Sequence, residues 1–582
     1  MREIKKIIPN AKLIQTEDLG KCHSTKKLQY QCDFENERRW ISLDILTGNL
    51  MRNSTMCEFF RKSGEVSNTS LEYFTENYYP PDIIGINHYI TSERFLDDDR
   101  KKYPQWSHAE NGEHKYSDVD ILRADIYKRE GHYNILKSVA ERYNLPIALT
   151  EVHLGSSREA QLRWFMEAYD ACLKLKREGV DIRAITAWSL LGAYDWNSLL
   201  TQENNFYESG AFDVRSGNPR PTAVANLVKQ LCEQKSPDHP VLQADGWWKN
   251  KDHVHFEFGV SENARTLPVI ESMFPENLLQ ANVRPILIIG ATGTLGRAFA
   301  HICSMRNISY VLLSRSDMDI TNSDQVELFF KKHEPWAVVN AAGFVKIDDA
   351  ESMRDICFRE NAYGPVTLAR ACKKCGARFL TFSSGMVFDG QTSNPYCETS
   401  STAPLNMYGE SKAYAEKYVL MENPSTLVVR SSAFFGPWDD FNFLAQMSKS
   451  LKKGQPFLVA NDQTVTPTYV PDLVNNCLDL LIDQERGIWH LTNSTSVTWS
   501  EFAVHAAKVA SLDEDLIVPV ATKTLGLRAK RPLYSALKSE KGIVLPALDD
   551  ATLRFFAQLP VEKQFKHFDV IKNYFRSKSK VL

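Results

Sequence analysis

Short apolar runs alternate with longer amphipathic stretches in two regions of the chain, residues 1–232 and residues 284–582. The runs have the length and composition of buried parallel strands, and the stretches between them have the period of surface helices. Strands that alternate with helices in this way predict two α/β domains. Residues 233–283 have no sustained period, and we expect a linker there that packs against one of the halves through Trp247 and Trp248.

Three glycines follow the first apolar run of the second region. This run, residues 285–289, precedes Gly290, Gly293 and Gly296 and then a helical segment. Glycines allow a tight turn and let the backbone approach a pyrophosphate at the N-terminus of the helix. A glycine-rich turn without a ligand is the alternative, but the strand–turn–helix context favours a nucleotide site. We therefore expect a Rossmann-like, doubly wound parallel sheet with a small substrate-binding subdomain.

The next strand of this sheet is expected to end at Ser314 and Arg315. A site that prefers NAD usually has an acidic residue here, whereas an arginine can bind the 2′-phosphate of NADP. NADP(H) is therefore the favoured cofactor and NAD(H) the alternative, and a plain surface arginine would also explain Arg315. The residues expected to bind the cofactor are Gly290, Thr292, Gly293, Leu295, Gly296, Arg315, Asp319, Ala341, Ala342 and Lys412.

The segment MYGESKAYAEKYV, residues 407–419, combines helix-forming residues with a tyrosine and a lysine four positions apart, Tyr408 and Lys412. Residues at i and i+4 share one face of a helix, so the phenol and the ammonium would be neighbours. We expect the ammonium to lower the pKa of the phenol and to prepare it for proton transfer. A chance pair on a solvated helix is the alternative, since the motif alone is short.

Five motifs in the second region occur together in one known family. Residues 340–351 align without gaps to the pattern NAAAYTAVDKAE. The segments SSGMVFDG, YGESK, VTPTY and RPLYSALKSEK match STDYVFDG, YGxSK, the end of GxPTY and RPxxSxLD. Residues 285–575 therefore resemble the dTDP-4-dehydrorhamnose reductases, which are extended short-chain dehydrogenases, and the GxxGxxG spacing of the glycines is typical of that group. The combination is far more specific than any one motif.

The resemblance implies NADPH-dependent reduction of the 4-keto group of a dTDP-4-dehydro-6-deoxyhexose, as in the biosynthesis of dTDP-L-rhamnose. It makes Tyr408 the proton donor, Lys412 the residue that lowers its pKa and holds the nicotinamide ribose, and Ser384 the partner of the substrate carbonyl. Asn361 and Arg430 match family positions with supporting roles. The residue types suit this chemistry, because hydride addition to a ketone leaves an alkoxide that needs a nearby hydroxyl and an acid.

One departure from the family pattern affects the site. Gly385 and Met386 replace the Asp–Tyr pair that commonly follows the catalytic hydroxyl residue. That aspartate lies near the reacting sugar in the family, so a second function stays open: a non-catalytic regulatory module that binds a sugar nucleotide or dinucleotide. The complete set of Ser384, Tyr408 and Lys412 favours the enzyme, because a regulatory module does not need all three.

Four apolar runs in the first region predict strands of an incomplete βα barrel, KLIQTED, DIIGINHY, LPIALTEVHLG and IRAITAWSLLGAYDWNSLL. They resemble the second half of glycoside hydrolase family 1. The resemblance makes Glu151 the candidate nucleophile and Tyr89 its hydrogen-bond partner. Trp188 and Trp196 match the family segment WSLLDNFEW, in which Asp195 replaces the glutamate that normally grips the sugar. A buried or ion-paired carboxylate is the other explanation of Glu151.

The family strand with the motif NEP, which supplies the general acid, has no counterpart in this sequence. Glu17, at the end of the first run, is the nearest substitute by sequence order. A retaining glycosidase needs two carboxyl groups on either side of the bond that it breaks. We therefore expect a vestigial site, with β-glycosidase activity as the less favoured alternative.

The composition of the chain argues against several classes of binding partner. The 69 Lys and Arg residues nearly balance the 72 Asp and Glu residues without a long basic block, which argues against a nucleic-acid or membrane-surface partner. The 11 cysteines and the histidines do not form zinc-type clusters, so no metal site is expected. The N-terminus lacks a secretory apolar core, and we expect a cytoplasmic enzyme for a nucleotide-sugar substrate, with a homodimer left open.

Overall fold

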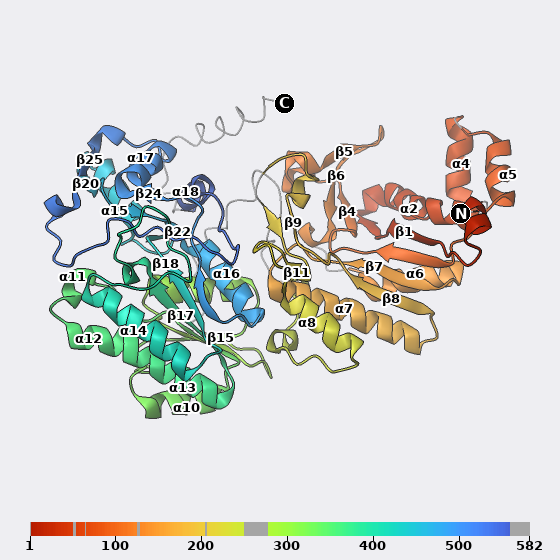
Figure 1. Cartoon of the computed structure of the whole chain (residues 1–582). Coiled ribbons are helices and arrows are strands. Elements are labelled where there is room, and N and C mark those ends of the chain that lie inside the picture. The colour runs from red at the N-terminus through yellow and green to blue at the C-terminus, as the bar shows by residue number, and fades with distance from the viewer. Residues whose placement is uncertain are drawn as a thin grey trace. The chain divides into compact units, whose positions relative to one another are not determined.

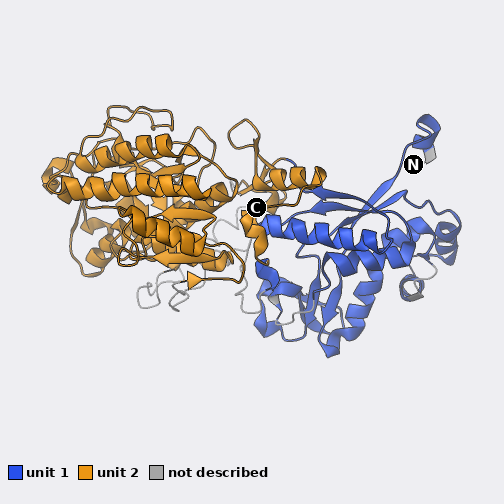
Figure 2. Ribbon diagram, turned by 90° about the horizontal axis from the view of Figure 1, so that it is seen from below, with its two compact units in different colours: residues 1–156, 160–190, 246–255 blue, residues 157–159, 191–245, 256–582 orange. Residues whose placement is uncertain are grey.

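The computed structural model describes residues 2–50, 54–64, 66–124, 129–203, 206–249 and 277–558. The chain forms two compact units, coloured separately in Figure 2. Unit 1 comprises residues 1–156, 160–190 and 246–255, and unit 2 comprises residues 157–159, 191–245 and 256–582. The domain boundaries expected from the sequence, 1–232, 233–283 and 284–582, stay predictions, and the compact units divide the chain at different positions.

Unit 1 contains a parallel sheet of four strands in the order β1-β3-β7-β8 (Figure 1). The strands lie in the four predicted runs: β1 (Ile14–Asp18), β3 (Ile83–Asn87), β7 (Ile147–Val152) and β8 (Ile182–Ala187). Ile84, Ile86 and Leu149 of the central strands are fully buried, which explains why these runs are apolar. Within the described residues the sheet stays open, so the incomplete barrel remains a prediction.

A second, mixed sheet of unit 1 has the order β2-β4-β6-β5. Its strands are β2 (Cys22–Ser24), β4 (Arg94–Asp97), β5 (His108–Glu110) and β6 (Lys115–Asp120). The helices are α1 (Arg2–Ile7), α2 (Gln29–Arg38), α3 (Ile41–Thr47), α4 (Ser54–Ser63), α5 (Asn68–Glu76), α6 (Gly131–Tyr143) and α7 (Arg158–Arg177), whose first two residues belong to unit 2.

The segment expected to be a linker is partly built into the two units. Trp248 is buried in unit 1, where its indole nitrogen donates to Glu167 at 3.0 Å and its ring centroid lies 5.3 Å from that of Trp164. Strand β13 (Asn277–Leu278) pairs antiparallel with β15 (Tyr310–Leu313) in unit 2. An indole that is buried and hydrogen-bonded accounts for a tryptophan in a segment that is otherwise polar.

Unit 2 contains a seven-stranded sheet in the order β13-β15-β14-β16-β17-β18-β23. The further strands are β14 (Ile286–Ile289), β16 (Ala337–Asn340), β17 (Arg378–Ser384), β18 (Leu427–Ser431) and β23 (Gly487–His490). All neighbours except β13 are parallel, which confirms the predicted parallel α/β sheet. The strand order reverses between β14 and β16, and ligands of such sheets bind outside the strand C-termini at this switch point.

The helices of this sheet form two groups (Figure 1). In one, α9 (Thr294–Met305) packs against α16 (Val470–Ile482). In the other, α13 (Gly364–Cys375) packs against both α10 (Ser323–His333) and α14 (Met407–Glu422). Members of both groups contact the strands, α9 at β14 and α14 at β17. Helix α14 carries the Tyr–Lys pair, so the fold brings this pair to the end of β17.

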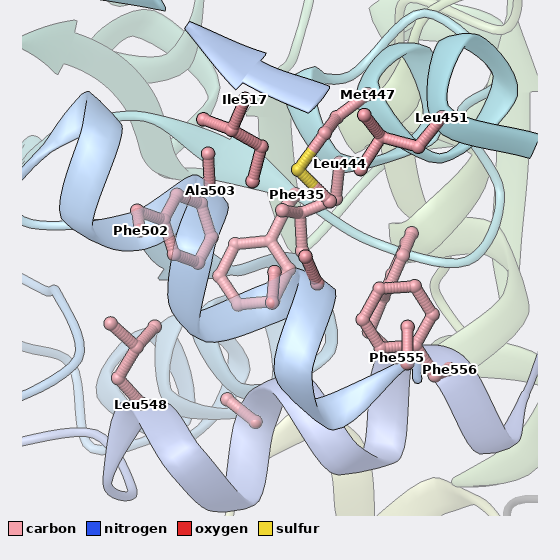
Figure 3. Packing of buried hydrophobic residues seen from close by; sticks show 14 of the residues in the cluster. Phe435, Leu444, Met447, Leu451, Phe502, Ala503, Ile517, Leu548, Phe555 and Phe556 are labelled. Atoms are coloured by element: carbon pink, nitrogen blue, oxygen red, sulfur yellow. The ribbon is translucent and has the colours of Figure 1, made fainter. Parts of the chain in front are cut away.

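A smaller part of unit 2 has a core of its own, shown in Figure 3. The Phe435 ring centroid lies 5.3 Å from that of Phe502 and 6.0 Å from that of Phe555. The elements around this core are α15 (Phe443–Lys452), α17 (Trp499–Val509), α18 (Leu548–Ala557) and the strand pairs β19 (Phe434–Phe435) with β22 (Thr468–Tyr469), β20 (Phe457–Ala460) with β25 (Ile517–Val520), and β21 (Thr464–Val465) with β24 (Val497–Thr498).

Residues 191–245 belong to unit 2, and Arg220 connects them to Asp483 of the same unit by an ion pair. Arg220 pairs with Asp213 at 2.9 Å and with Asp483 at 3.3 Å, and Arg158 pairs with the same Asp483 at 2.8 Å. The segment contains β9 (Ala193–Tyr194), β10 (Tyr207–Glu208), β11 (Phe212–Asp213), β12 (Arg220–Pro221) and α8 (Ala223–Cys232). Among the described helices of the chain, none is long and apolar enough to span a bilayer.

Candidate functional site

The turn between β14 and α9 has the shape that a pyrophosphate requires. Gly290 has a φ of +116°, and a Cβ on it would lie 2.9 Å from the backbone of Ala341. A Cβ on Gly296 would lie 2.0 Å from the Gly290 carbonyl oxygen, so only glycine lets the helix start this close to the strand. Gly293 is the N-cap of α9, and no side chain of the described residues caps the helix. The amides of the first turn are therefore available to an anion.

The other predicted cofactor residues near this turn differ in exposure and location. They are Thr292, Leu295, Ala341 and Ala342. Thr292 is exposed beside the turn, whereas Leu295 is buried, so only its backbone amide could face a ligand. Ala341 and Ala342 follow β16 at the switch point, and Asn340 accepts from the Ala342 amide at 3.3 Å. Small side chains at this point leave room for a nucleotide at the carboxyl edge of the sheet.

Arg315 lies just after β15 with an ion pair that the sequence did not indicate. Its guanidinium contacts Glu360 at 2.5 Å and the more distant Asp319 at 3.9 Å, and its side chain is 58% exposed. Asp319 mainly accepts from the backbone and hydroxyl of Thr321, at 2.9 and 2.7 Å. The structure thus brings the predicted Arg315 and Asp319 together and adds Glu360, which no local pattern marks because it lies 45 positions away.

Helix α14 brings Tyr408 and Lys412 to the end of β17. The helix starts after Asn406, whose side chain accepts from the Gly409 amide at 2.8 Å. A Cβ on Gly409 would lie 2.2 Å from the Met386 carbonyl oxygen, so this glycine allows the first turn to approach the strand end. Tyr408 is half-buried and hydrogen-bonds to Ser384, the last residue of β17. All three predicted catalytic residues therefore meet at one edge of the sheet.

Burial controls the ionisation of this pair. It raises the pKa of the Tyr408 phenol to about 12, and the hydrogen bond with Ser384 acts in the opposite direction. Burial also lowers the pKa of the Lys412 ammonium to about 8, against the opposing effects of Cys357 and Glu416. The shift of the phenol comes mainly from its burial, and the expectation that Lys412 lowers its pKa stays a prediction. The phenol keeps its proton throughout the neutral range, as an acid must.

Lys412 is held between β17 and the loop that follows β16. Only 8% of the residue is exposed, and its ammonium donates to the Phe382 carbonyl at 3.2 Å. A Cβ on Gly343 would lie 3.4 Å from Lys412 Nζ and 2.7 Å from Asn361 Oδ1. The ammonium therefore lies next to the switch point, where a cofactor ribose would be within its reach.

Asn361 fixes the same loop from a single π-helical turn, η9 (Arg359–Tyr363), which follows α12 (Arg354–Phe358). Its side-chain oxygen accepts from the Phe344 amide at 2.8 Å, and its nitrogen donates to the Phe344 carbonyl at 3.0 Å and to Ser411 Oγ at 3.1 Å. π turns are rare and occur often at functional sites. This one ties helix α14 to the loop beside Lys412.

Arg430 of β18 contacts helix α14, which carries Tyr408 and Lys412. Its guanidinium makes two hydrogen bonds to the Glu416 carboxylate, at 2.7 and 2.6 Å, and both side chains are buried. Glu416 follows Lys412 by one turn of α14. The Arg430–Glu416 pair thus connects β18 to helix α14, which is the kind of supporting role that the resemblance implies for Arg430.

Gly385 faces the late segment RPLYSALKSEK. A Cβ on Gly385 would lie 3.0 Å from the Ser535 carbonyl oxygen and 3.8 Å from Leu537 Cδ2. Arg531, at the start of the segment, pairs with Asp348 of α11 (Ile347–Ala350) at 2.7 Å. The segment therefore packs on the end of β17, and the missing aspartate side chain leaves space that this contact uses.

The sequence-predicted residues of unit 1 meet at the carboxyl edge of its sheet. The Tyr89 hydroxyl donates a short hydrogen bond to Glu151, as expected. Burial and the nearby Asp18 raise the pKa of the Glu151 carboxyl, and His153 opposes them. Asp18, rather than Glu17, is thus the second carboxylate near Glu151, since Asp18 and Glu151 both pair with Asn87 across the sheet.

Trp188 and Trp196, which were predicted to belong to the glycosidase-like site, lie in different units. The Trp188 ring lies 4.8 Å from that of His153 in unit 1. Trp196 starts the short turn η6 (Trp196–Ser198) in unit 2 and is 43% exposed, next to a buried Asp195 that accepts from the Phe206 amide at 2.8 Å. Among the described residues, no group of three or more His, Cys, Asp and Glu side chains could hold a metal ion.

Comparison with known proteins places unit 2 in a family. Residues 284–548 match the RmlD substrate binding domain. A dTDP-4-dehydrorhamnose reductase of Streptomyces griseus is 32% identical over 261 residues, which are 44% of this chain and 86% of that protein. The spore coat polysaccharide biosynthesis protein SpsK of Bacillus subtilis is 29% identical over 46% of this chain and 92% of its own.

A solved structure adds a similar match. The crystal structure of dTDP-4-dehydrorhamnose reductase from Bacillus anthracis in complex with NADP is 30% identical, with a TM-score of 0.45, over 47% of this chain and 98% of that one. The sequence matches and the family motifs agree on the same class. Through its C-terminal part, the chain belongs to the dTDP-4-dehydrorhamnose reductase family.

Proposed function

We propose that unit 2 catalyses the NADPH-dependent reduction of the 4-keto group of a dTDP-4-dehydro-6-deoxyhexose, giving a dTDP-L-rhamnose-type product. One observation carries this proposal: Ser384, Tyr408 and Lys412 meet at the carboxyl edge of a parallel sheet, beside a turn that has no room for a Cβ at Gly290 or Gly296. The relative from Streptomyces griseus, 32% identical, is named for the same reaction.

The residues present fit a dinucleotide. The first turn of α9 would hold the pyrophosphate, Arg315 the 2′-phosphate and Lys412 the nicotinamide ribose. When bound, NADPH supplies the hydride. Because Lys412 is buried next to the loop after β16, it orients the ribose and keeps a positive charge close to the phenol.

The proton that the reduced substrate receives comes from Tyr408 of the protein. Ser384 and Tyr408 hydroxyls would both hydrogen-bond to the keto oxygen of the substrate. Once the keto carbon gains a hydride, its oxygen becomes an alkoxide and takes the proton of the Tyr408 phenol. The C4–O double bond becomes a single bond, with one new C–H bond and one new O–H bond. The Tyr408 phenolate that remains is stabilised by the Lys412 ammonium, because a buried ammonium is poorly hydrated and interacts strongly with a nearby negative charge.

The test is a binding titration of the full chain with dTDP, UDP and GDP sugars, followed by NADPH oxidation with the matching 4-keto sugars. We expect the dTDP series to bind and to oxidise NADPH. The second candidate, a regulatory module, is favoured by Gly385 in place of the family aspartate. Tight binding of NADPH and sugar nucleotide without any oxidation would favour that module and exclude the reductase.

Cofactor choice gives a first prediction. Replacing Arg315 with Glu should lower NADPH affinity by about tenfold, the scale of one charge-assisted hydrogen bond, and should affect NADH much less. The matched control is Arg370→Glu, which removes another exposed arginine, paired with Glu422 at 3.2 Å. Titrations with both cofactors measure the effect. Equal losses for NADPH and NADH would show that Arg315 does not discriminate between them.

Unit 1 is predicted not to hydrolyse glycosides. A retaining hydrolase needs a nucleophile and a general acid, two carboxyl groups about 5–5.5 Å apart. The family strand with the motif NEP, which supplies the general acid, has no counterpart in this sequence. Incubation of the full chain with a panel of aryl β-glycosides should give no turnover. Turnover that disappears in Glu151→Gln would contradict this prediction and restore the hydrolase function.

The cellular setting is also part of the proposal. We place the enzyme in the cytoplasm, with a nucleotide sugar as its substrate and neither nucleic acid nor membrane as a partner, because its charges nearly balance and lack a long basic block. A homodimer stays a prediction, which light scattering of the purified chain would test.

A further inference from the structure

Four charged side chains gather where the adenosine ribose of a dinucleotide would lie, beyond the end of β15. Arg315 contacts Glu360 at 2.5 Å, Arg359 contacts the same oxygen of Glu360 at 3.3 Å, and Arg315 also lies 3.9 Å from Asp319. A 2′-phosphate bound to Arg315 would share the guanidinium with Glu360, which contacts Nη1. The carboxylate and the phosphate therefore compete for one cation.

The fold holds Glu360 in place, whereas the side chain of Arg315 can move. Glu360 belongs to the π turn η9, and its neighbour Asn361 is held by Phe344 and Ser411 through three hydrogen bonds. Only 18% of the Glu360 side chain is exposed, against 58% for Arg315. A guanidinium on a long exposed side chain can turn to a new partner at low cost, whereas Glu360 must stay where the turn holds it.

We infer that Glu360 is the residue that sets cofactor selectivity in unit 2, by competing with the 2′-phosphate of NADPH for Arg315. This inference rests on the proposed function. The Glu360 carboxylate neutralises part of the Arg315 charge and repels the 2′-phosphate of NADPH, so the advantage of NADPH over NADH is reduced. NADH has no phosphate and leaves the pair intact, so Glu360 makes the site accept both cofactors.

The test compares NADPH and NADH affinities of the full chain and of Glu360→Gln by calorimetric titration. An exposed ion pair is worth up to about fivefold in affinity, so NADPH should bind about fivefold more tightly to the variant, whereas NADH affinity should not change. The gain should shrink in high salt, because Arg315 is solvent-exposed. The matched control is Glu327→Gln, which removes an exposed glutamate paired with Lys374 at 2.9 Å on another part of the fold.

A double-variant cycle isolates the mechanism. In the Arg315→Ala background, Glu360→Gln should lose most of its effect on NADPH, because the cation for which the groups compete is gone. An NADPH-to-NADH affinity ratio that does not move in Glu360→Gln, or that moves equally in both backgrounds, would overturn the inference and leave the proposed function intact. A wild-type chain that binds neither cofactor would overturn both.

Discussion

Tyr408→Phe is expected to lose roughly a hundredfold or more of the turnover with a 4-keto sugar nucleotide, the usual contribution of a general acid. The substitution removes only the hydroxyl that delivers the proton, and the ring keeps its place next to Lys412, whose ammonium lies 5.9 Å from the ring centroid. NADPH affinity should therefore survive. Turnover is measured as NADPH oxidation, and affinity is measured by titration of the same preparation.

Two further variants make this result specific. Tyr418→Phe removes a phenol from the same helix, where its ring is stacked on Tyr414 at 4.1 Å, and should leave turnover nearly unchanged. Lys412→Ala should reduce both turnover and NADPH affinity, because this residue would contact the cofactor. Near-normal turnover in Tyr408→Phe would refute the assignment of the catalytic acid.

Arg306→Met is expected to destabilise unit 2 by about 3–5 kcal/mol, the range for removing one partner of a buried ion pair. Arg306 ends α9 and makes two 3.1 Å contacts to Glu159, whose side chain is fully buried, and a 2.6 Å contact to Asp479. Without the guanidinium, the Glu159 carboxylate stays buried with its cation gone. Denaturant unfolding measures the change.

The control for this prediction is Glu233→Gln, which breaks an exposed pair with Lys235 and should change the unfolding free energy very little. The double variant Glu159→Leu with Arg306→Met should recover much of the loss, because an apolar pair leaves no buried charge. A loss below about 1 kcal/mol in Arg306→Met, the scale of a surface pair, would contradict the account of this ion pair.

Much of the fold could be predicted because it depends on local pattern. Strands β3, β14 and β16 are apolar over several consecutive residues because they are buried, and Gly290 and Gly296 mark a turn that only glycine can form. The position of Tyr408 and Lys412 on one helix could also be predicted, because their i and i+4 spacing places them on one face.

Other features depend on contacts between distant positions. Arg220 and Asp483 are 263 positions apart, and a charged residue alone gives no sign that its partner will bury it, so the sequence did not place residues 191–245 in unit 2. Glu360 and its partner Arg315 were separated in the same way. The rise in the pKa of Tyr408 could not be predicted, because helix spacing gives the neighbour of a phenol but not its burial.

The choice between Glu17 and Asp18 shows a further limit. Adjacent strand residues point to opposite faces, and only the pairing of β1 with β3 shows that Asp18 shares a row with Glu151. The sequence alone suggested Glu17 because Glu17, like Glu151, lies at the end of a predicted strand.

The central claim is that this chain is a reductase rather than a binding module. The most direct measurement is multiple-turnover oxidation of NADPH by the purified full chain with a dTDP-4-dehydro-6-deoxyhexose, with the reduced sugar nucleotide quantified in parallel. The account predicts one reduced sugar for each NADPH oxidised, over many turnovers, and near loss of both signals in Tyr408→Phe. Saturable binding of NADPH and the sugar nucleotide with no oxidation in the wild-type chain would contradict it.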